Sequence, residues 1–406
     1  MKIRSITFFY NPLIQDGDFI RKLGEIAHSI KTSCQLNGFE VQSLRLSTQP
    51  FPKIMGVSKY NQTIDWVIDL EKVASANGFT YLSIGPALIN HPESYHFIPE
   101  ILQQTKNVFT SGMIADQDHG INFFALEACS KIILQAAGFE PNGFGNLRFS
   151  ALANVKPLGP FFPGSYFDES KPTGFSIAIE AADEVLSVFR IATSFSEARE
   201  NLLNILQEKA HQIESILSEN LQNFHLEFFG FDFSVAPFPE DSCSLGNALE
   251  TLGVSSLGDH GSLAAAAFLA ETLDRGNWKK IGFNGLMLPL LEDSILAKRS
   301  ISGTLKIKDL LLYSAVCGTG LDTIPISGDV QASAVQSLLL DIAALSSRLR
   351  KPLTARLMPI PGKKSGDLTD FDFEFFKNGR ILDIETSPLS NLLAYSNENL
   401  TINPRK

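Results

Sequence analysis

Short apolar, β-branched or aromatic runs alternate with amphipathic stretches along almost the whole chain. The runs are typical of buried strands and predict about ten of them, at residues 3–9, 40–46, 80–84, 107–110, 147–153, 175–179, 226–235, 280–288, 321–326 and 353–358. The stretches between them have helical spacing and predict helices that include residues 19–36, 63–75, 121–135, 195–218, 261–273 and 330–349. This alternation predicts an α/β fold with a mainly parallel sheet and helices outside it. So many units without a long linker favour one large closed or nearly closed sheet.

Residues 370–384, DFDFEFFKNGRILDI, break this rhythm. Two alternating runs flank Asn378 and Gly379, and an Asn-Gly pair in that position predicts a β-hairpin. The polar residues 385–406 are expected to form a surface extension or an interface arm. We therefore expect one large domain over residues 1–384, with any subdomain junction in the Pro- and Gly-rich residues 159–172.

Charge and cysteine usage narrow the classes of partner. The formal net charge of −10 argues against a surface that holds nucleic acid or anionic membrane, because both need clustered Lys and Arg. The first residues lack the apolar length of a signal peptide. The four cysteines lie far apart without a CxxC pair, so neither a zinc knuckle nor a disulfide framework is indicated. We expect a cytoplasmic protein that binds a small molecule, and the sequence allows a homo-oligomer.

Ligands of parallel α/β proteins bind beyond the carboxyl ends of strands, and several polar residues lie at or near predicted strands. Asp232 lies inside the apolar stretch FFGFDFSVA, where an unpaired carboxylate would be costly. It therefore needs a basic residue, a metal, a substrate or backbone N–H groups as its partner. It is either a group of a functional site or a buried structural aspartate.

His260 and Asp322 are the candidate proton carriers. His260 lies at the start of an Ala-rich helical stretch, where it can exchange a proton at neutral pH or serve as an ordinary turn residue. Asp322 begins a predicted strand after the CGTG turn. In that turn Cys317 fits a packed thiol at an apolar helix end. The two glycines fit a helix-to-strand turn better than a nucleotide site.

A second group of residues is expected to bind the ligand. Arg356 alternates with apolar neighbours in a predicted strand, so its guanidinium should pair with a carboxylate of the protein or of a ligand. The loop 362–366 can hold an anion through backbone N–H groups and Lys363, or can be a solvated turn. Asn122 and Asn284 are also expected to bind the ligand.

A divalent metal is compatible with the sequence, which by itself requires no cofactor. The segment GMIADQDHGINFFALEAC is rich in metal-ligating residue types, among them Asp116 and His119, but it lacks an HxxxH or HxH spacing. A metal held by Asp232, His260 and Asp322 is the other arrangement to test.

Five segments in order, SVAPFPEDS, LGDHGSLAA, FNGLMLPLLEDS, CGTGLDTIPI and ARLMPIPGKKSGD, carry a family resemblance. They resemble domain-of-unknown-function family 711, a group of uncharacterised bacterial and archaeal proteins. Order and spacing are similar over about residues 226–370, and more loosely at residues 120–123 and 160–167.

The resemblance implies a fold similar to the barrel of pyruvate formate-lyase-like glycyl radical enzymes, which has ten strands in two five-stranded parallel halves. Radical catalysis is disfavoured. Those enzymes need a radical glycine in a loop like RVSGY and a cysteine inside the barrel. Here Gly379 lies in an Asn-Gly turn, and Phe109 stands where some members of the family have a cysteine.

Together these features predict an enzyme, a lyase or a hydrolase, that acts on a small anionic metabolite in a barrel pocket by acid–base chemistry. Arg356 and Lys363 would hold the anion. His260 and Asp322 would exchange protons, and Asp232 would orient or ionise a partner. The alternative is a non-catalytic protein of the same fold that binds a metabolite or acts in an assembly.

Overall fold

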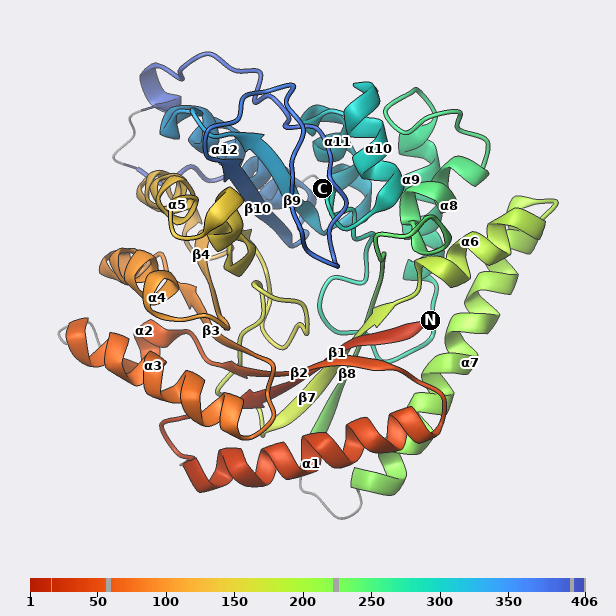
Figure 1. Cartoon of the computed structure of the whole chain (residues 1–406), viewed down its shortest axis with the longest axis horizontal. Coiled ribbons are helices and arrows are strands. Elements are labelled where there is room, and N and C mark those ends of the chain that lie inside the picture. The colour runs from red at the N-terminus through yellow and green to blue at the C-terminus, as the bar shows by residue number, and fades with distance from the viewer. Residues whose placement is uncertain (16, 56–59, 222–225, 395–397, 405–406) are drawn as a thin grey trace.

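The computed structural model describes residues 1–15, 17–55, 60–221, 226–394 and 398–404. Ten strands form one sheet in the order β8-β7-β1-β2-β3-β4-β6-β10-β9, with the two-residue β5 paired to β4 (Figure 1). Their bounds are β1 (Lys2–Tyr10), β2 (Val41–Thr48), β3 (Tyr81–Ala87), β4 (Val108–Asp116), β5 (Gly120–Ile121), β6 (Phe149–Ala153), β7 (Gly174–Glu180), β8 (Glu227–Ala236), β9 (Gly320–Ser327) and β10 (Leu353–Ile360).

The sheet is mixed. Strands β1, β2, β3, β4 and β6 are adjacent and run parallel. The direction reverses between β1 and β7 and again between β6 and β10, while β8 follows β7 and β9 follows β10 in parallel. The α/β class is confirmed, but the prediction of a mainly parallel sheet is wrong. A strand buried on both faces shows the same apolar run in either direction, so the sequence could not reveal the reversals.

Residues 279–290 connect the two edges of the sheet. Ile281 donates its backbone N–H to Phe231 of β8 at 3.0 Å, and Leu290 donates to Asp322 of β9 at 3.0 Å. Only single bridges form, so the strand predicted at residues 280–288 is wrong. Gly282 and Asn284 have positive φ angles of 78° and 45°, which interrupt the extended backbone that a strand needs.

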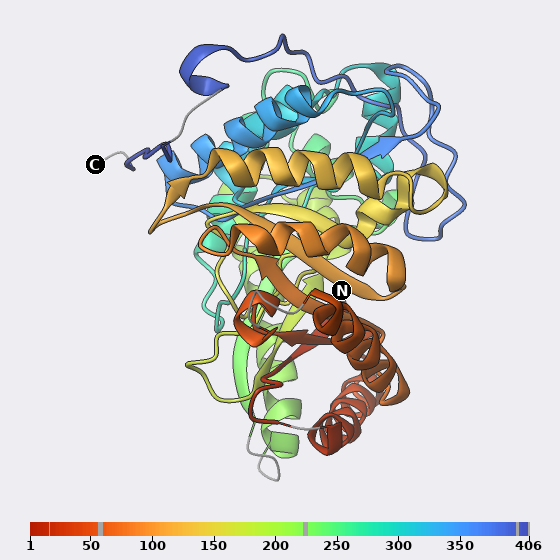
Figure 2. The ribbon, with the colours of Figure 1, turned by 90° about the vertical axis from the view of Figure 1, so that its left-hand side faces the viewer.

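Helices cover the outside of the sheet, as predicted. The long helices are α1 (Gly17–Leu36), α3 (Tyr60–Ala76), α5 (Phe123–Ala136), α7 (Phe195–Leu221), α9 (Ser262–Asp274), α11 (Ile307–Cys317) and α12 (Ala332–Leu349). The shorter ones are α2 (Phe51–Met55), α4 (Ile98–Gln104), α6 (Ala182–Ile191), α8 (Leu245–Thr251) and α10 (Ser294–Ser302). Figure 2 shows α4, α5 and α12 one above another, in contact. Within the described ranges, no helix combines the length and apolar character needed to cross a membrane.

The segment 158–166, between β6 and β7, lies in the centre of the molecule (Figure 1). Its backbone carbonyls accept hydrogen bonds from hydroxyl groups on the strands. Thr7 donates to Pro160 at 2.9 Å, and Ser176 donates to Leu158 at 2.7 Å. Ser83 donates to the carbonyl of residue 165 at 2.7 Å. These hydroxyls supply the hydrogen bonds that water would provide to an irregular backbone at the surface.

The hairpin predicted at residues 370–384 is also wrong. The chain reverses at residues 372–377, and no strand forms on either side. Asn378 does not sit in a two-residue turn, because its side-chain oxygen accepts the backbone N–H of Phe371 at 2.7 Å. Phe144 contacts three aromatic rings of this segment, Phe371, Phe373 and Phe376. Antiparallel pairing is limited to a single bridge between Leu368 and Arg380 and the backbone hydrogen bonds beside it. Farther along, Leu400 exchanges two backbone hydrogen bonds with Ile121 of β5.

Asp293 fixes the segment that leads into α10. It is buried and accepts the backbone N–H groups of Ile295 and Leu296 as the helix N-cap, at 2.9 and 3.1 Å. The same carboxylate accepts the hydroxyl of Ser244 at 2.6 Å and the N–H of Gly246 at 3.0 Å, at the start of α8. One buried carboxylate therefore binds backbone N–H groups at the N-termini of both α10 and α8.

We predict that Asp293→Ala lowers the free energy of unfolding by about 3 kcal/mol, because several buried donors lose their acceptor together. Asp309→Ala is the control. Asp309 accepts one N–H group, that of Lys306, in the capping box at the start of α11. Its loss should cost about 1 kcal/mol. Denaturant unfolding of both variants checks this, and equal losses would contradict the role of Asp293.

Candidate functional site

A cavity of about 290 Å³ is lined from β1, β2, β3, β4, β9 and β10 and from three loop segments. Two of the predicted residues, Asp322 and Arg356, lie in its wall. A second cavity, of about 270 Å³, lies between α10, α11, α12 and residues 380–386. None of the predicted site residues lines this second cavity. The first cavity is therefore the candidate site.

Four residues of the wall of the 290 Å³ cavity, Arg4, Glu292, Asp322 and Arg356, form a chain of ion pairs with Glu180, which lies outside the lining. Arg4 donates to Glu180 at 3.0 Å and to Glu292 at 2.5 Å. Arg356 donates to Glu292 at 3.0 Å and to Asp322 at 2.5 Å. Each guanidinium is thus neutralised by two carboxylates, and Glu292 is shared between them. Burial raises the pKa of Glu180, and the neighbouring Arg4 opposes this rise.

A β-bulge places Asp322 in the wall. Two residues of β9, Asp322 and Thr323, oppose the single residue Arg356 of β10. Thr323 has a φ angle of 45°, a left-handed conformation that is strained for a β-branched residue. Such strain is tolerated where the surrounding contacts hold the backbone in place. Here the strained backbone orients the carboxylate of Asp322 next to the guanidinium of Arg356.

Arg45 lies in the same cavity without a carboxylate contact. Its Nε donates to Ser43 at 3.0 Å, and its guanidinium lies 5.1 Å from the ring centre of Phe162 and 5.7 Å from that of Tyr81. No Asp or Glu among the described residues forms an ion pair with it. Burial, together with the charges of Arg4 and Arg356, lowers the pKa of Arg45 to about 9, and the charge of Glu292 opposes this change. No carboxylate in the described ranges is in contact with its positive charge.

Aromatic rings form much of the remaining wall. Tyr81 and Phe109 have ring centres 5.2 Å apart, and Phe109 and Phe162 are 5.4 Å apart. On another side the guanidinium of Arg4 lies 5.5 Å from the ring centre of Phe375. The cavity is lined by seven aromatic side chains: Tyr81, Phe109, Phe161, Phe162, Phe373, Phe375 and Phe376.

Asp232 lies outside the cavity lining and holds a loop in place. Its carboxylate accepts the backbone N–H groups of Phe283 and Asn284 at 2.7 and 2.9 Å, and the hydroxyl of Ser234 at 2.5 Å. Asn284 is equally engaged, since its side-chain oxygen accepts from Phe233 and Trp278. Of the partners considered for Asp232, the structure supplies backbone N–H groups. Both residues attach residues 279–290 to β8.

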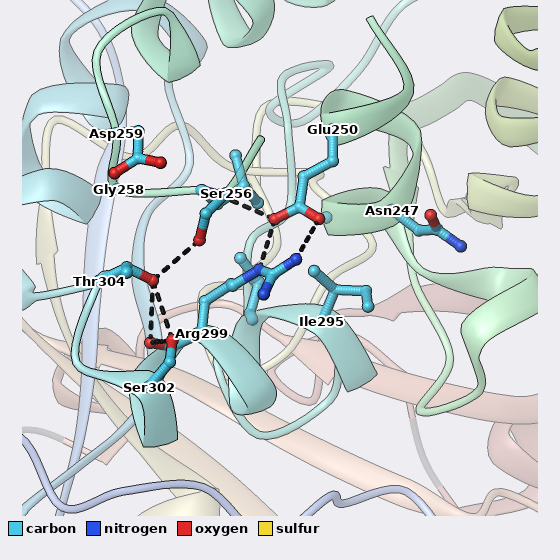
Figure 3. Close-up of polar contacts among 12 residues, drawn as sticks. Asn247, Glu250, Ser256, Gly258, Asp259, Ile295, Arg299, Ser302 and Thr304 are labelled. Atoms are coloured by element: carbon cyan, nitrogen blue, oxygen red, sulfur yellow. Dashed lines mark hydrogen bonds and ion pairs between the residues drawn. The ribbon is translucent and has the colours of Figure 1, made fainter. Parts of the chain in front are cut away.

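His260 is exposed in the turn before α9 and is not among the residues that line the cavity. Figure 3 shows how the neighbouring residues pack. Glu250 holds Arg299 through two bonds of 2.7 Å beside this turn. Gly258 has a φ angle of 102°, and a Cβ atom there would lie 1.8 Å from the carbonyl oxygen of Thr304. The lack of space for a Cβ atom explains why a glycine begins the segment GDHG.

The other predicted residues have local partners away from the cavity. Asn122 is the N-cap of α5 and accepts the N–H of Ala125 at 2.7 Å. Lys363 donates to the carbonyl of Leu368 at 2.7 Å and pairs with an aspartate on the same loop. Cys317 is buried at the end of α11. Of the four residues expected to converge, Asp322 and Arg356 share the cavity, whereas Asp232 and His260 lie outside its lining.

No group of three or more His, Cys, Asp or Glu side chains in the described part of the chain could hold a metal ion. This includes the set of Asp232, His260 and Asp322. Asp116 and His119 do contact each other, at 2.9 Å, but Asp116 also accepts the backbone N–H of His119 at 2.7 Å. That pair closes the turn between β4 and β5.

Sequence reasoning missed Arg4, Arg45, Glu180 and Glu292. The signal that identified Arg356, a charged residue inside an apolar strand, is also present for Arg4 in KIRSITFF and for Arg45 in VQSLRLST. Glu292 lies in a loop and carries no such signal, whereas Glu180 directly follows the strand predicted at residues 175–179 and could have been found as a polar residue at a strand end. The aromatic residues 373–376 were assigned to a hairpin instead of to a cavity wall.

A family model described as uncharacterised ACR, DUF711, matches residues 1–378. The chain belongs to the DUF711 family. A UPF0210 protein of Clostridium perfringens is 26% identical over 352 residues, which cover 82% of this chain and 77% of that protein. UPF0210 proteins of Neisseria meningitidis serogroup C and Oenococcus oeni are each 27% identical, over 359 and 364 residues. They cover 82% and 84% of this chain and 77% and 80% of their own lengths. These names state no activity.

All residues that line the 290 Å³ cavity lie within the part of the chain that matches DUF711. They include Phe109, the position at which the resemblance implies a cysteine in some members of DUF711. The segment 380–386, which lines the second cavity, lies beyond the matched residues. The candidate site thus belongs to the DUF711 portion of this protein.

Asp232 gives a test of pH-dependent stability in this DUF711 protein. Burial raises its pKa to about 6, against the opposing effect of its three hydrogen-bond donors. The protonated form is therefore favoured by folding. Its contribution to stability is complete below the unfolded-state pKa of about 4 and is lost as the pH rises through about 6.

We expect the stability advantage of the wild type over Asp232→Asn to shrink between pH 4 and pH 7, as measured by denaturant unfolding at each pH. The exposed Asp241→Asn variant is the control and should differ from the wild type by a nearly constant amount. An advantage that grows with pH would show that Asp232 is stabilised by folding in its ionised form.

Proposed function

We propose that this protein is an enzyme that binds a small organic anion in the 290 Å³ cavity and transfers a proton there, as a lyase or a hydrolase. The observation that carries the proposal is Arg45. A guanidinium that lies in a cavity without a carboxylate contact, while two neighbouring guanidinium groups are fully paired, is a site for an external anion.

Arg45 is suited to hold a carboxylate. Ser43 and the rings of Phe162 and Tyr81 restrict its guanidinium, so little side-chain freedom is lost when an anion binds. Removal from water strengthens the attraction between the two charges. The lowered pKa of Arg45 supports this role, because a bound anion would restore the stability of its charged form.

Asp322 is the proton acceptor in this proposal. One of its oxygens, Oδ1, accepts the Nε–H of Arg356 at 2.5 Å, and the carboxylate lies in the cavity wall. Arg356 thus positions Asp322. Glu292 holds Arg356 in turn, and the strained bulge holds Asp322. A proton on a bound ligand or water molecule within reach of the second oxygen could pass to Asp322. His260 and Asp232 have no part in this mechanism.

For the fold, we propose the barrel that the family resemblance implies. Support comes from the five parallel strands at the centre of the sheet, from the four strands of opposite direction around them, and from residues 279–290, which bond to both edges. A ligand inside such a barrel is a small molecule and not a nucleic acid or a membrane. We also place the protein in the cytoplasm, which fits its four free cysteines.

Replacing Arg45 tests the anion site. We predict that Arg45→Met abolishes the thermal stabilisation that small carboxylates give the wild type, with an affinity loss of about 100-fold or more. The folded protein should be about as stable without ligand, because the variant removes a guanidinium that no carboxylate of the described residues contacts. Thermal-shift measurements with a panel of carboxylates and phosphates check both effects.

Arg199→Met is the matched control. Arg199 also lies over a phenylalanine, with its guanidinium 5.0 Å from the ring centre of Phe268, and it pairs with Glu271 away from the cavity. Its replacement should leave the ligand response unchanged. Stabilisation that survives in Arg45→Met would place the anion elsewhere.

Asp322→Asn separates catalysis from binding. The amide oxygen can still accept a hydrogen bond from Arg356, so the affinity should stay within a few-fold of the wild type, whereas proton transfer should slow by about 100-fold or more. Product formation from each binding compound is followed by nuclear magnetic resonance, with Asp309→Asn as control. If the wild type returns every bound compound unchanged, the protein is the non-catalytic binder that the sequence also allows.

A further inference from the structure

We infer that the cavity takes a planar, conjugated monocarboxylate, of which the aromatic carboxylates are the simplest class. This inference rests on the proposed anion site at Arg45 and specifies what the rest of the ligand must be. It follows from three properties of the cavity: the number of free positive charges, the nature of the walls and the volume.

The charge pattern limits the ligand to one anionic group. Arg4 and Arg356 each contact two carboxylates within the protein. Arg45 is the third guanidinium in the wall, and no carboxylate of the described residues pairs with it. A second anionic group on the ligand would meet Glu292 or Asp322, which are already negative. Dicarboxylates and polyphosphates are therefore poor ligands.

The walls favour a ligand with a π-system. Tyr81, Phe109 and Phe162 form one connected group of rings beside Arg45, with ring centres 5.2 and 5.4 Å apart. The C-terminal segment supplies a second group, in which Phe373 lies 5.3 Å from Phe375. A planar ring against either group can add edge-to-face or offset contacts, which a saturated ring of similar size cannot make.

The volume of about 290 Å³ sets the size of the ligand. It is at the lower end for small-molecule sites, which fits one ring with a short carboxylate arm. A carboxylate conjugated to the ring also shares its plane, so it can meet the planar guanidinium of Arg45 without a rotation that costs entropy.

The test compares benzoate with cyclohexanecarboxylate, which has the same charge and a similar volume but no π-face. Affinities for the full chain are measured by ligand-observed nuclear magnetic resonance. We expect benzoate to bind at least about fivefold more tightly, the gain of one or two ring contacts. Phthalate, which has a second carboxylate, should bind at least tenfold more weakly than benzoate.

Two variants show which part of the argument holds. Phe162→Leu keeps an apolar wall and should reduce the preference for benzoate over cyclohexanecarboxylate, while Arg45→Met should weaken both compounds. If cyclohexanecarboxylate binds as tightly as benzoate or more tightly, and its binding depends on Arg45, the inference is overturned. The proposed anion site would still stand. Binding of both compounds that does not depend on Arg45, or the absence of binding by any carboxylate, would overturn the proposed function itself.

Discussion

The carboxylate of Glu292 binds two arginines that lie far apart in the sheet, Arg4 on β1 and Arg356 on β10. Four strands separate β1 from β10, so five steps of about 4.8 Å would place them about 24 Å apart in a flat sheet. Two arginine side chains cannot bridge that span and still share one carboxylate. The sheet must therefore curve around Glu292, and the cavity lies where the curve brings the strands together.

Part of this arrangement could be read from the sequence and part could not. The α/β class and the long helices follow from local periodicity. Arg356 was identified because a charged residue interrupts an apolar run, and Asp322 because it begins a predicted strand after the CGTG turn. The segment 280–288 was misread because its composition fits a strand, while the contacts of Asp232 and Asn284 force a looped backbone. Arg45 carries the same sequence signal as Arg356, but its lack of a carboxylate partner depends on pairing across the interior, which spacing along the chain does not reveal.

Polar groups inside the molecule have two distinct roles. Hydroxyls such as those of Thr7, Ser83 and Ser176 satisfy the carbonyls of the segment 158–166 and leave nothing free to bind a ligand. Asp232 and Asp293 do the same for backbone N–H groups at loop and helix ends. In the wall of the 290 Å³ cavity, Arg45 is a strong donor that no Asp or Glu of the described residues contacts. Burial alone would therefore have been a poor guide to function.

The wall formed by Phe373, Phe375 and Phe376 comes after β10 in the chain, outside any strand. During synthesis these residues leave the ribosome only after every strand has been made. A chain that ended at residue 370 would lack these three aromatic side chains of the cavity wall and would still contain Arg4, Arg45, Glu292, Asp322 and Arg356.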